Sequence, residues 1–198
     1  NRQFAVQDWF YQVNNIMHAM RNSPKANFAG QNFERWISMG AFGTGSLFID
    51  FMAGVGLRYR CVNLRDTFFL ENHQGIIDSV YRCFKHTARQ AAQRWGEKNL
   101  PERVQKALEN PQRQNEFFDF LHVVAPRTDY DSGRADARGK PWASYYLSVP
   151  DKMQLGPEGG FTSFPYSIAR YVTAPEEVYG RSPAMTALAD IKMLNEMS

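Results

Sequence analysis

The first 45 residues alternate between apolar and polar positions with the period of an α-helix. Apolar side chains in the first segment recur at three- and four-residue steps: Val6, Trp9, Phe10, Val13, Ile16, Met17 and Met20. Such a stripe predicts an amphipathic helix, and Ser23 and Pro24 predict its end and the start of a second helix. The second helix has one apolar side, made of Phe33, Trp36, Ile37 and Gly40. Two amphipathic helices joined by a short turn predict an N-terminal helical hairpin.

Beyond Gly43, Thr44 and Gly45 the pattern changes to the short apolar runs that are typical of β-strands. We expect strands at residues 46–53, 57–62, 67–70, 76–84, 117–125, 143–149 and 166–172, with a turn at 54–56 around Val55. Two short helices are predicted between the fourth and fifth strands, over about 87–110, because Thr87 caps one helix and Pro101 opens the other. The polar segment 127–140 is predicted to be an exposed, mobile loop.

The chain closes with another helix signal, in which Ser182 is a cap and Pro183 occupies the first helical position. The predicted fold class is therefore α+β, with an N-terminal helical hairpin, a mostly antiparallel sheet with an inserted helical pair, and a C-terminal exit helix. We divide the chain into ranges 1–45, 46–178 and 179–198. It begins at Asn1 without a methionine and stops at Ser198 within a predicted helix, so we expect a piece of a longer protein.

Composition excludes several classes of protein. The 198 residues are 43% apolar and 22% charged, which is typical of a folded domain rather than a disordered chain. Uninterrupted apolar stretches are far shorter than the ~20 residues of a membrane span, so we expect no membrane partner. Cys61 and Cys83 are too few for a disulfide framework. The simplest interpretation is an intracellular protein with two reduced thiols packed inside strands.

Charge is nearly balanced overall, with 23 basic and 20 acidic residues, but it is uneven along the chain. Residues 80–115 carry eight lysines and arginines against three glutamates. The candidate contact residues in this stretch are Arg89, Arg94, Lys98, Arg103 and Lys106. One interpretation is an ordinary solvated helical surface; the other is a contact with nucleic acid or an acidic partner. The second would make the chain a nucleic-acid-binding α+β module whose affinity for DNA falls with salt.

Two motifs resemble catalytic or phosphate-binding signatures but lack an essential part. Gly40 and Gly45 have the spacing of a phosphate-binding loop, yet Ser46 stands at the lysine position and the helix precedes the strand. A glycine-rich helix end fits better. The segment around Ser182 resembles a nucleophile elbow, but the following Pro183 has no N–H for an oxyanion hole. The sequence therefore offers no convincing enzyme site and predicts no cofactor, with a hydrolase or nucleotide enzyme kept as an alternative that turnover assays would test.

Metal-binding patterns are equally incomplete. The four histidines are scattered: His18, His73, His86 and His122. Asp129, Asp131 and Gly133 hint at a calcium loop, but Lys140 occupies the position where the loop needs its closing glutamate. We predict no metal site and no catalytic residue.

Several motifs, in the same order along nearly the whole chain, resemble those of one protein family. The stretches are Phe42-Gly-Thr-Gly-Ser-Leu-Phe-Ile49, Asp78-Ser-Val-Tyr-Arg-Cys-Phe-Lys85 followed by Thr87-Ala-Arg-Gln-Ala91, Ala125-Pro-Arg-Thr-Asp-Tyr-Asp131, and Glu177-Val-Tyr-Gly-Arg-Ser-Pro-Ala-Met185 followed by Leu188-Ala-Asp-Ile-Lys-Met-Leu-Asn195. They are similar to the head-to-tail connector, or portal, proteins of short-tailed bacteriophages and related prophages. The resemblance implies a structural protein and no enzymatic activity.

The same resemblance implies a set of partners and a place in the phage. Portal subunits form a ring, typically a dodecamer, at one capsid vertex of the virion, after assembly in the host cytoplasm. Genomic DNA passes through the channel, driven by a terminase, and capsid or scaffold proteins and a tail adaptor bind the ring. Because family members are much longer, this chain corresponds to the outer wing and the start of a helix toward the stem. Most channel-lining residues then lie outside it.

Assembly roles are expected at two places. Gly43 and Gly45 are predicted to form the turn from helix to strand. The start of the last helix is predicted to depend on Tyr179, Gly180, Arg181, Ser182 and Pro183. We hypothesise that Arg181 forms an ion pair with a neighbouring subunit or within the wing.

Overall fold

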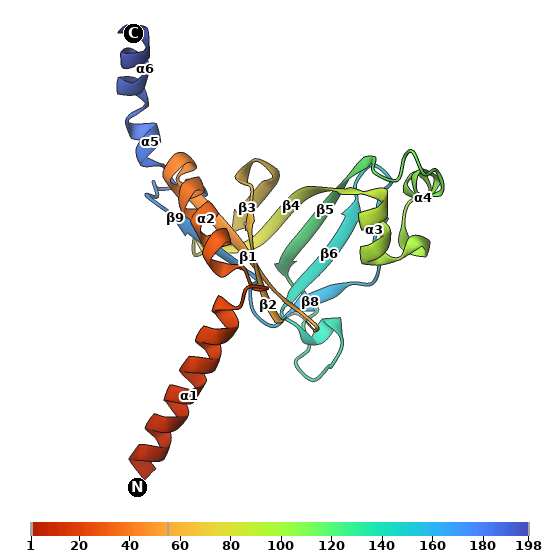
Figure 1. Cartoon of the computed structure of the whole chain (residues 1–198), viewed down its shortest axis with the longest axis horizontal. Helices are drawn as coiled ribbons and strands as arrows, with labels where there is room; N and C mark the ends of the chain where they lie inside the picture. The colour runs from red at the N-terminus through yellow and green to blue at the C-terminus, as the bar shows by residue number, and fades with distance from the viewer. Residues whose placement is uncertain (1, 55, 198) are drawn as a thin grey trace. The chain divides into compact units, whose positions relative to one another are not determined.

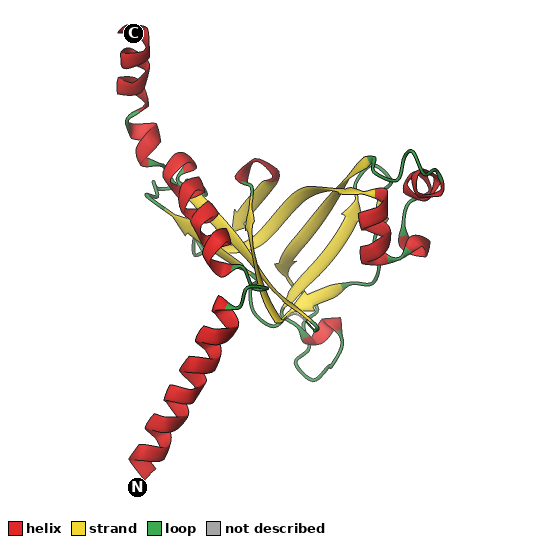
Figure 2. Cartoon of the chain, in the orientation of Figure 1, coloured by secondary structure: helices red, strands yellow, loops and turns green. Residues whose placement is uncertain are grey.

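A computed structural model describes residues 2–54 and 56–197, with helices toward both ends and strands between them (Figure 1, Figure 2). The α+β class is thus confirmed. By spatial contacts the chain forms two compact units, residues 1–64 together with 165–198, and residues 65–164. This division follows contacts in space, whereas the ranges expected from the sequence follow chain order. Asn1, Val55 and Ser198 lie outside the described residues.

Two helices open the first unit, α1 (Arg2–Asn22) and α2 (Phe28–Phe42), with the turn expected near Ser23 between them. The packing expected of a helical hairpin is not present. The predicted apolar side chains of α1 are exposed except for the half-buried Val13, and Phe33, Trp36 and Ile37 of α2 are exposed as well. Helical periodicity correctly predicted both helices but not the surroundings of their apolar sides.

The first unit has a three-stranded antiparallel sheet of β1 (Thr44–Met52), β2 (Gly56–Val62) and β9 (Tyr166–Arg170), in the order β2-β1-β9. The central strand pairs Ser46 with Val62 on one side and with Ile168 on the other. Gly54 and Gly56 flank the β1–β2 turn, and both have a positive φ that favours glycine. The core of this unit includes the buried side chains of Leu47, Phe48, Val62 and Tyr166.

The second unit holds a separate antiparallel sheet, so the single predicted sheet is in fact two. Its strands are β3 (Thr67–Glu71), β4 (Ile77–Thr87), β5 (Phe117–Pro126), β6 (Trp142–Ser148) and β7 (Met153–Gln154), in that order, with β8 (Gly159–Phe161) also paired to β6. The sequence analysis missed β7 and β8, which are two and three residues long. Single-turn 3₁₀ helices lie at Leu64–Asp66, Glu97–Asn99 and Ala137–Gly139.

The predicted helical pair is present between β4 and β5, as α3 (Ala88–Trp95) and α4 (Glu102–Glu109). The Thr87 side chain caps α3 by accepting from the Gln90 N–H, and the Gln90 side chain accepts from the Thr87 N–H in return. The two helices cover one end of the sheet in a single hydrophobic cluster: Ala88, Ala91, Leu100, Val104, Ala107, Phe118, Phe120 and Leu155. The second unit therefore buries the apolar sides of its own helices.

The segment after β5 covers the range 127–140, for which an exposed, mobile loop is predicted. It is exposed along most of its length, but the Arg127 side chain is buried and forms ion pairs with Asp129, at 3.3 Å, and with Glu158. Arg127 also donates to the carbonyl oxygens of Lys140 and Gly159. The exposure of the segment agrees with the prediction, and the sequence did not indicate that Arg127 is a buried cross-link within it.

The C-terminal helix is present as α5 (Pro183–Thr186) and α6 (Leu188–Met197), separated by a turn at Ala187. None of the helices described over 2–54 and 56–197 combines the length and the apolar character required to cross a membrane.

Candidate functional site

Gly43 is the first element of a junction in the first unit. It ends α2 in the left-handed conformation, with a φ of 79°, and its N–H donates to the carbonyl oxygen of Met39 at 2.9 Å. Its own carbonyl oxygen accepts from the N–H of Tyr171 at 2.8 Å, just after β9. The predicted turn at Gly43 is therefore present, and it joins α2, β1 and the end of β9.

Gly180 lies directly against Gly43. A Cβ atom on either glycine would overlap the carbonyl oxygen of the other. The N–H of Gly180 donates to the buried Thr44 hydroxyl at 2.8 Å, across 136 residues of sequence. The structure thus brings together the two groups of residues for which assembly roles were expected. We call the set of Gly43, Thr44, Gly180 and Ser182 the glycine junction.

Ser182 connects the junction to the last helix. Its hydroxyl accepts from the Met185 N–H at 2.9 Å, which is an N-cap, and donates to the Ala41 carbonyl oxygen at 2.9 Å. Pro183 occupies the first turn of α5, where a missing N–H costs nothing. Since the cap residue is itself hydrogen-bonded to the end of α2, the start of α5 is fixed relative to α2.

The neighbouring members of the motif lie at its surface. The Arg181 N–H donates to the Val172 carbonyl oxygen at 2.7 Å, while its guanidinium pairs with Glu177 at 2.6 Å in the same chain. The hydrogen bond from Arg181 lowers the pKa of the Glu177 carboxyl. Tyr179 is 38% exposed beside this pair. The described contact of Arg181 is therefore within the chain, on an exposed surface.

Gly45 does not belong to the turn that we expected. It lies within β1, paired with Ala169 of β9. A Cβ at this position would stand 2.5 Å from the carbonyl oxygen of Arg35, so glycine is required where α2 approaches the strand closely. The role of Gly45 is thus packing of helix on strand.

The five basic candidates of the second unit are spread over α3, the Glu97–Asn99 turn and α4. Three of the five side chains make contacts with other residues of the same unit. The Arg94 guanidinium lies 4.3 Å from the centre of the Tyr146 ring. Arg103 pairs with Asp151 at 2.8 Å, and Lys106 pairs with Glu102 at 2.6 Å. Arg89 and Lys98 are exposed. Part of this positive charge is therefore engaged within the unit, by cation–π contact and ion pairing.

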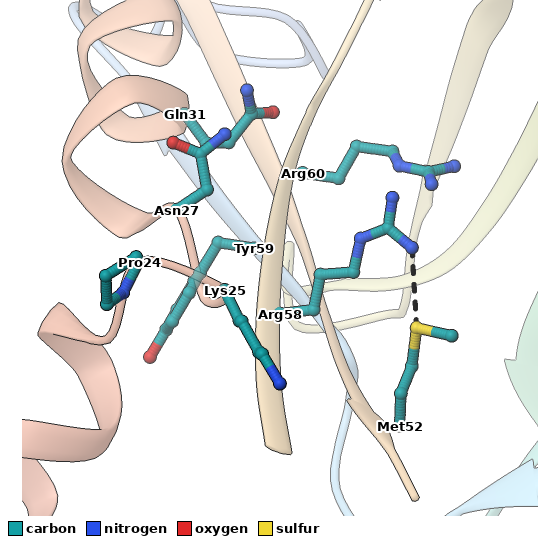
Figure 3. A pocket seen from close by; sticks show the side chains of 8 residues that line it. All are labelled: Pro24, Lys25, Asn27, Gln31, Met52, Arg58, Tyr59 and Arg60. Carbon is teal, nitrogen blue, oxygen red and sulfur yellow. Dashed lines mark hydrogen bonds between the residues drawn. The ribbon is translucent and has the colours of Figure 1, made fainter. Parts of the chain in front are cut away.

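An open pocket of about 600 Å³ lies beside β2 in the first unit (Figure 3). Its lining includes three basic side chains, Lys25, Arg58 and Arg60. Figure 3 shows Arg58 and Arg60 on one side of β2 and Tyr59 on the other, and the Arg58 guanidinium donates to the Met52 sulfur at 3.4 Å. Backbone groups on this edge strand are satisfied, since the N–H of Tyr59 donates to Ala26 and that of Cys61 to the Gln31 side chain. The pocket is therefore a gap at the edge of the sheet, where the segment between α1 and α2 and the start of α2 already bind the backbone N–H groups of β2.

The thiols are less buried than expected. Cys61 is half-buried and Cys83 is exposed, and both are free. Partial burial raises the pKa of both thiols, which keeps them protonated and weakly nucleophilic at neutral pH. Within residues 2–54 and 56–197, no cluster of three or more histidine, cysteine, aspartate or glutamate side chains is arranged to hold a metal ion.

One buried polar group was missed by the sequence analysis. His122, on β5, is 1% exposed, stacks on Tyr146 at 4.2 Å between ring centres, and contacts the Ser144 hydroxyl at 3.0 Å. Burial, with the positive charges of Arg82 and Arg94, lowers the pKa of His122 to about 3. The imidazole is therefore neutral at physiological pH and serves as part of the packed sheet.

Comparison with known proteins gives one consistent result. The family model for "Bacteriophage head to tail connecting protein" matches residues 1–198. The chain is 28% identical over 193 residues to the probable portal protein of Bordetella phage BPP-1. It is 29% identical over 191 residues to the portal protein of Salmonella phage epsilon15. Each alignment covers 96% of this chain but 34% of the relative, so the chain spans about a third of their length.

Proposed function

Because this chain belongs to the family of bacteriophage head to tail connecting proteins, we propose that it is part of a structural subunit of a phage portal. The portal is the ring through which genomic DNA is packaged and ejected and to which the tail attaches. The observation that carries this proposal is the match of the family model along the whole chain. Two phage portal proteins that align with 96% of the chain support it.

The glycine junction fits this role physically. Every subunit of a closed ring repeats the same contacts, so the direction of its connecting elements must be reproducible. At the junction α2, β1, β9 and α5 are joined by backbone contact at Gly43 and Gly180 and by the two hydrogen bonds of the Ser182 hydroxyl. Such contacts leave little freedom for the start of α5. We infer that the junction sets the direction in which the chain leaves the wing.

The partners follow from the same proposal. The subunit joins identical copies in a ring, with a dodecamer as the expected number, at the head–tail vertex of the virion, after assembly in the host cytoplasm. Terminase, capsid or scaffold proteins and a tail adaptor bind that ring, and DNA passes through its channel. The role is structural and involves no enzymatic reaction. Arg181 stabilises its own wing through Glu177 in this account.

Electron microscopy of the full-length protein tests the proposal directly. We expect closed rings with a central channel. A full-length protein that stays monomeric under all assembly conditions would contradict a portal role. In the same preparation, Arg181→Ala is expected to leave ring closure intact while lowering ring stability. Rings of unchanged stability would remove Arg181 from the assembly residues.

The basic surface of the second unit offers a separate check. Three of its five candidate cations already contact groups within the unit. We therefore expect weak DNA binding by the full-length protein through this surface. Arg89→Ala with Lys98→Ala is expected to leave DNA affinity unchanged at low salt. A large loss, with a shallower dependence on salt, would favour the nucleic-acid-binding module instead.

A further inference from the structure

Helix α2 turns its apolar side away from its own sheet. Phe33, Trp36 and Ile37 are 66%, 54% and 57% exposed. Their spacing places them on one side of the helix, with Gly40 one turn further on. We call this set the α2 apolar side. A helix that packs on a sheet normally places its apolar side inward, so the orientation of α2 is reversed.

Polar contacts hold α2 in this orientation. The Gln31 side chain accepts from the Cys61 N–H of β2 at 2.6 Å. The Ser38 hydroxyl donates to the carbonyl oxygen of Thr44 at 2.9 Å, and Arg35 donates to the Ser167 hydroxyl at 3.3 Å. Each of the three strands is therefore hydrogen-bonded to the side of α2 opposite Phe33 and Trp36. Rotating the helix to bury its apolar side would break all three contacts.

Helix α1 carries a second exposed stripe. Six of its large apolar side chains are between 41% and 64% exposed: Val6, Trp9, Phe10, Ile16, Met17 and Met20. They follow helical spacing on one side of a 21-residue helix. We call this set the α1 stripe. The two sets are different in sequence and in length, so neither is a copy of the other.

We infer that the α1 stripe of one copy packs against the α2 apolar side of a second copy. This inference rests on the proposed function, because a ring needs two different, complementary surfaces on each subunit. Contact between unlike surfaces is heterologous and propagates from subunit to subunit until the ring closes. Both surfaces exist in this chain, and each remains exposed in the single copy.

The two surfaces differ in length but together are large enough for an interface. At 1.5 Å per residue, the α1 stripe runs for about 21 Å and the α2 apolar side, from Phe33 to Gly40, for about 11 Å. Aromatic side chains offer roughly 150–250 Å² each, so the two exposed sets together leave on the order of 1,000 Å² of apolar area. A standard interface buries about 1,600 Å², of which roughly 60% is apolar. One α1–α2 contact therefore supplies about the apolar area that a stable interface needs.

Gly40 provides a feature that suits helix packing. A Cβ added at this position meets nothing within 4 Å, so the surface there is open. An open glycine beside Trp36 and Ile37 leaves a notch into which a side chain of another helix fits. A bulky residue at this position fills the notch without disturbing the chain's own fold, which makes it a useful test.

The experiment uses two variants of the full-length protein, each defective in one surface. Trp9→Glu with Ile16→Glu alters the α1 stripe, and Trp36→Glu with Ile37→Glu alters the α2 apolar side. Gly40→Arg is a second variant of the α2 side. The control is Gln7→Glu with Asn15→Glu, which adds the same two negative charges at exposed positions of α1 outside the stripe. Because the altered residues are largely exposed, circular dichroism is expected to be unchanged for all of them.

Native mass spectrometry then gives the assembly state. We expect rings from the wild type and the control, and loss of rings from each defective variant alone. An equimolar mixture of the two defective variants is expected to form 1:1 heterodimers, because each retains one intact surface. Homodimers of either variant, or no dimer in the mixture, would overturn the head-to-tail pairing.

Two further outcomes separate this inference from the proposed function. If the defective variants still form normal rings, the two apolar sets are covered by other parts of the full-length chain or by another protein, and the inference fails while the portal role stands. If the wild type itself forms no ring, the proposed function fails first.

Discussion

The two units use amphipathic helices in opposite ways. In the second unit, α3 and α4 bury Ala88, Ala91, Val104 and Ala107 against their own sheet. In the first unit, α2 has no fully buried residue, and the side chains of Phe33, Trp36 and Phe42 are exposed to solvent. The second unit is therefore stabilised by its own core, whereas the first unit combines a small core with helices whose apolar sides are exposed. A subunit of an assembly needs both kinds of region.

The largest effect is expected from the core of the second unit. Phe120 is 1% exposed and lies 5.1 Å from Trp95 between ring centres. Phe120→Ala is expected to lower the free energy of unfolding of this unit by about 4 kcal/mol, through lost burial and a cavity. Urea unfolding, detected by segment-resolved hydrogen exchange, measures this change in the unfolding free energy of the second unit.

The matched variant is Phe33→Ala on the exposed side of α2. It is expected to change the unfolding free energy of the single copy by no more than about 0.5 kcal/mol. Similar losses from both substitutions would erase the contrast between the two units.

The next effect is expected at the glycine junction. Gly180→Ala places a methyl group against the backbone of Gly43, which cannot move without distorting β1. We expect the free energy of unfolding of the first unit to fall by about 3 kcal/mol, with no change in the second unit. Gly40→Ala is the control, because its methyl group enters open space and raises helix stability by roughly 0.5–1 kcal/mol. Equal effects at the two glycines would show that the junction is not tightly packed.

The units should also differ in their response to acid. The pKa of His122 is lowered to about 3 by burial, whereas the unfolded chain binds this proton near 6.5. Below pH 6.5 the unfolded state therefore takes up a proton that the native state refuses, and stability falls until about pH 3. Each pH unit costs about 1.4 kcal/mol, so the second unit is expected to lose about 2 kcal/mol between pH 6.5 and 5.

Comparing the wild type with His122→Gln isolates this contribution. Between pH 6.5 and 5, the unfolding free energy of the variant is expected to fall less steeply with decreasing pH than that of the wild type. This difference does not depend on the stability of the variant at pH 7. Parallel stability curves for the two proteins would mean that the imidazole is accessible to protons in the folded state.

The smallest effect concerns the cap of the last helix. Ser182→Ala removes the acceptor for the Met185 N–H and the donor to the Ala41 carbonyl oxygen. We expect it to lower the free energy of unfolding by about 1 kcal/mol. Ser132→Ala, at an exposed loop position, is the control. Hydrogen exchange in α5 reports the loss locally. Unchanged protection of α5 would show that the cap does not hold the helix start.

Local signals in the sequence were sufficient for much of the fold. Thr87 predicted the start of α3, and Ser182 with Pro183 predicted that of α5, because capping depends on residues only a few positions apart. Strand positions were largely found for the same reason. The short strands β7 and β8 carried too few residues for a pattern.

Long-range packing could not be predicted in this way. Periodicity identified the apolar side of α2, but only the contacts of Gln31, Arg35 and Ser38 decide that it faces outward. The contact of Gly180 with Gly43 joins distant segments, and no local pattern marks it. Gly45 was assigned to a turn because glycine is common there, while its role depends on how closely α2 approaches β1.

The four tryptophans allow one direct test, because two lie in each unit. Trp9 and Trp36 are on the exposed sides of α1 and α2, while Trp95 and Trp142 are half-buried in the second unit. Hydroxyl-radical footprinting of the full-length protein, before and after assembly, measures their accessibility. We expect oxidation of Trp9 and Trp36 to fall several-fold on assembly, with Trp95 and Trp142 unchanged. Equal oxidation of Trp9 and Trp36 in the two states would contradict the account.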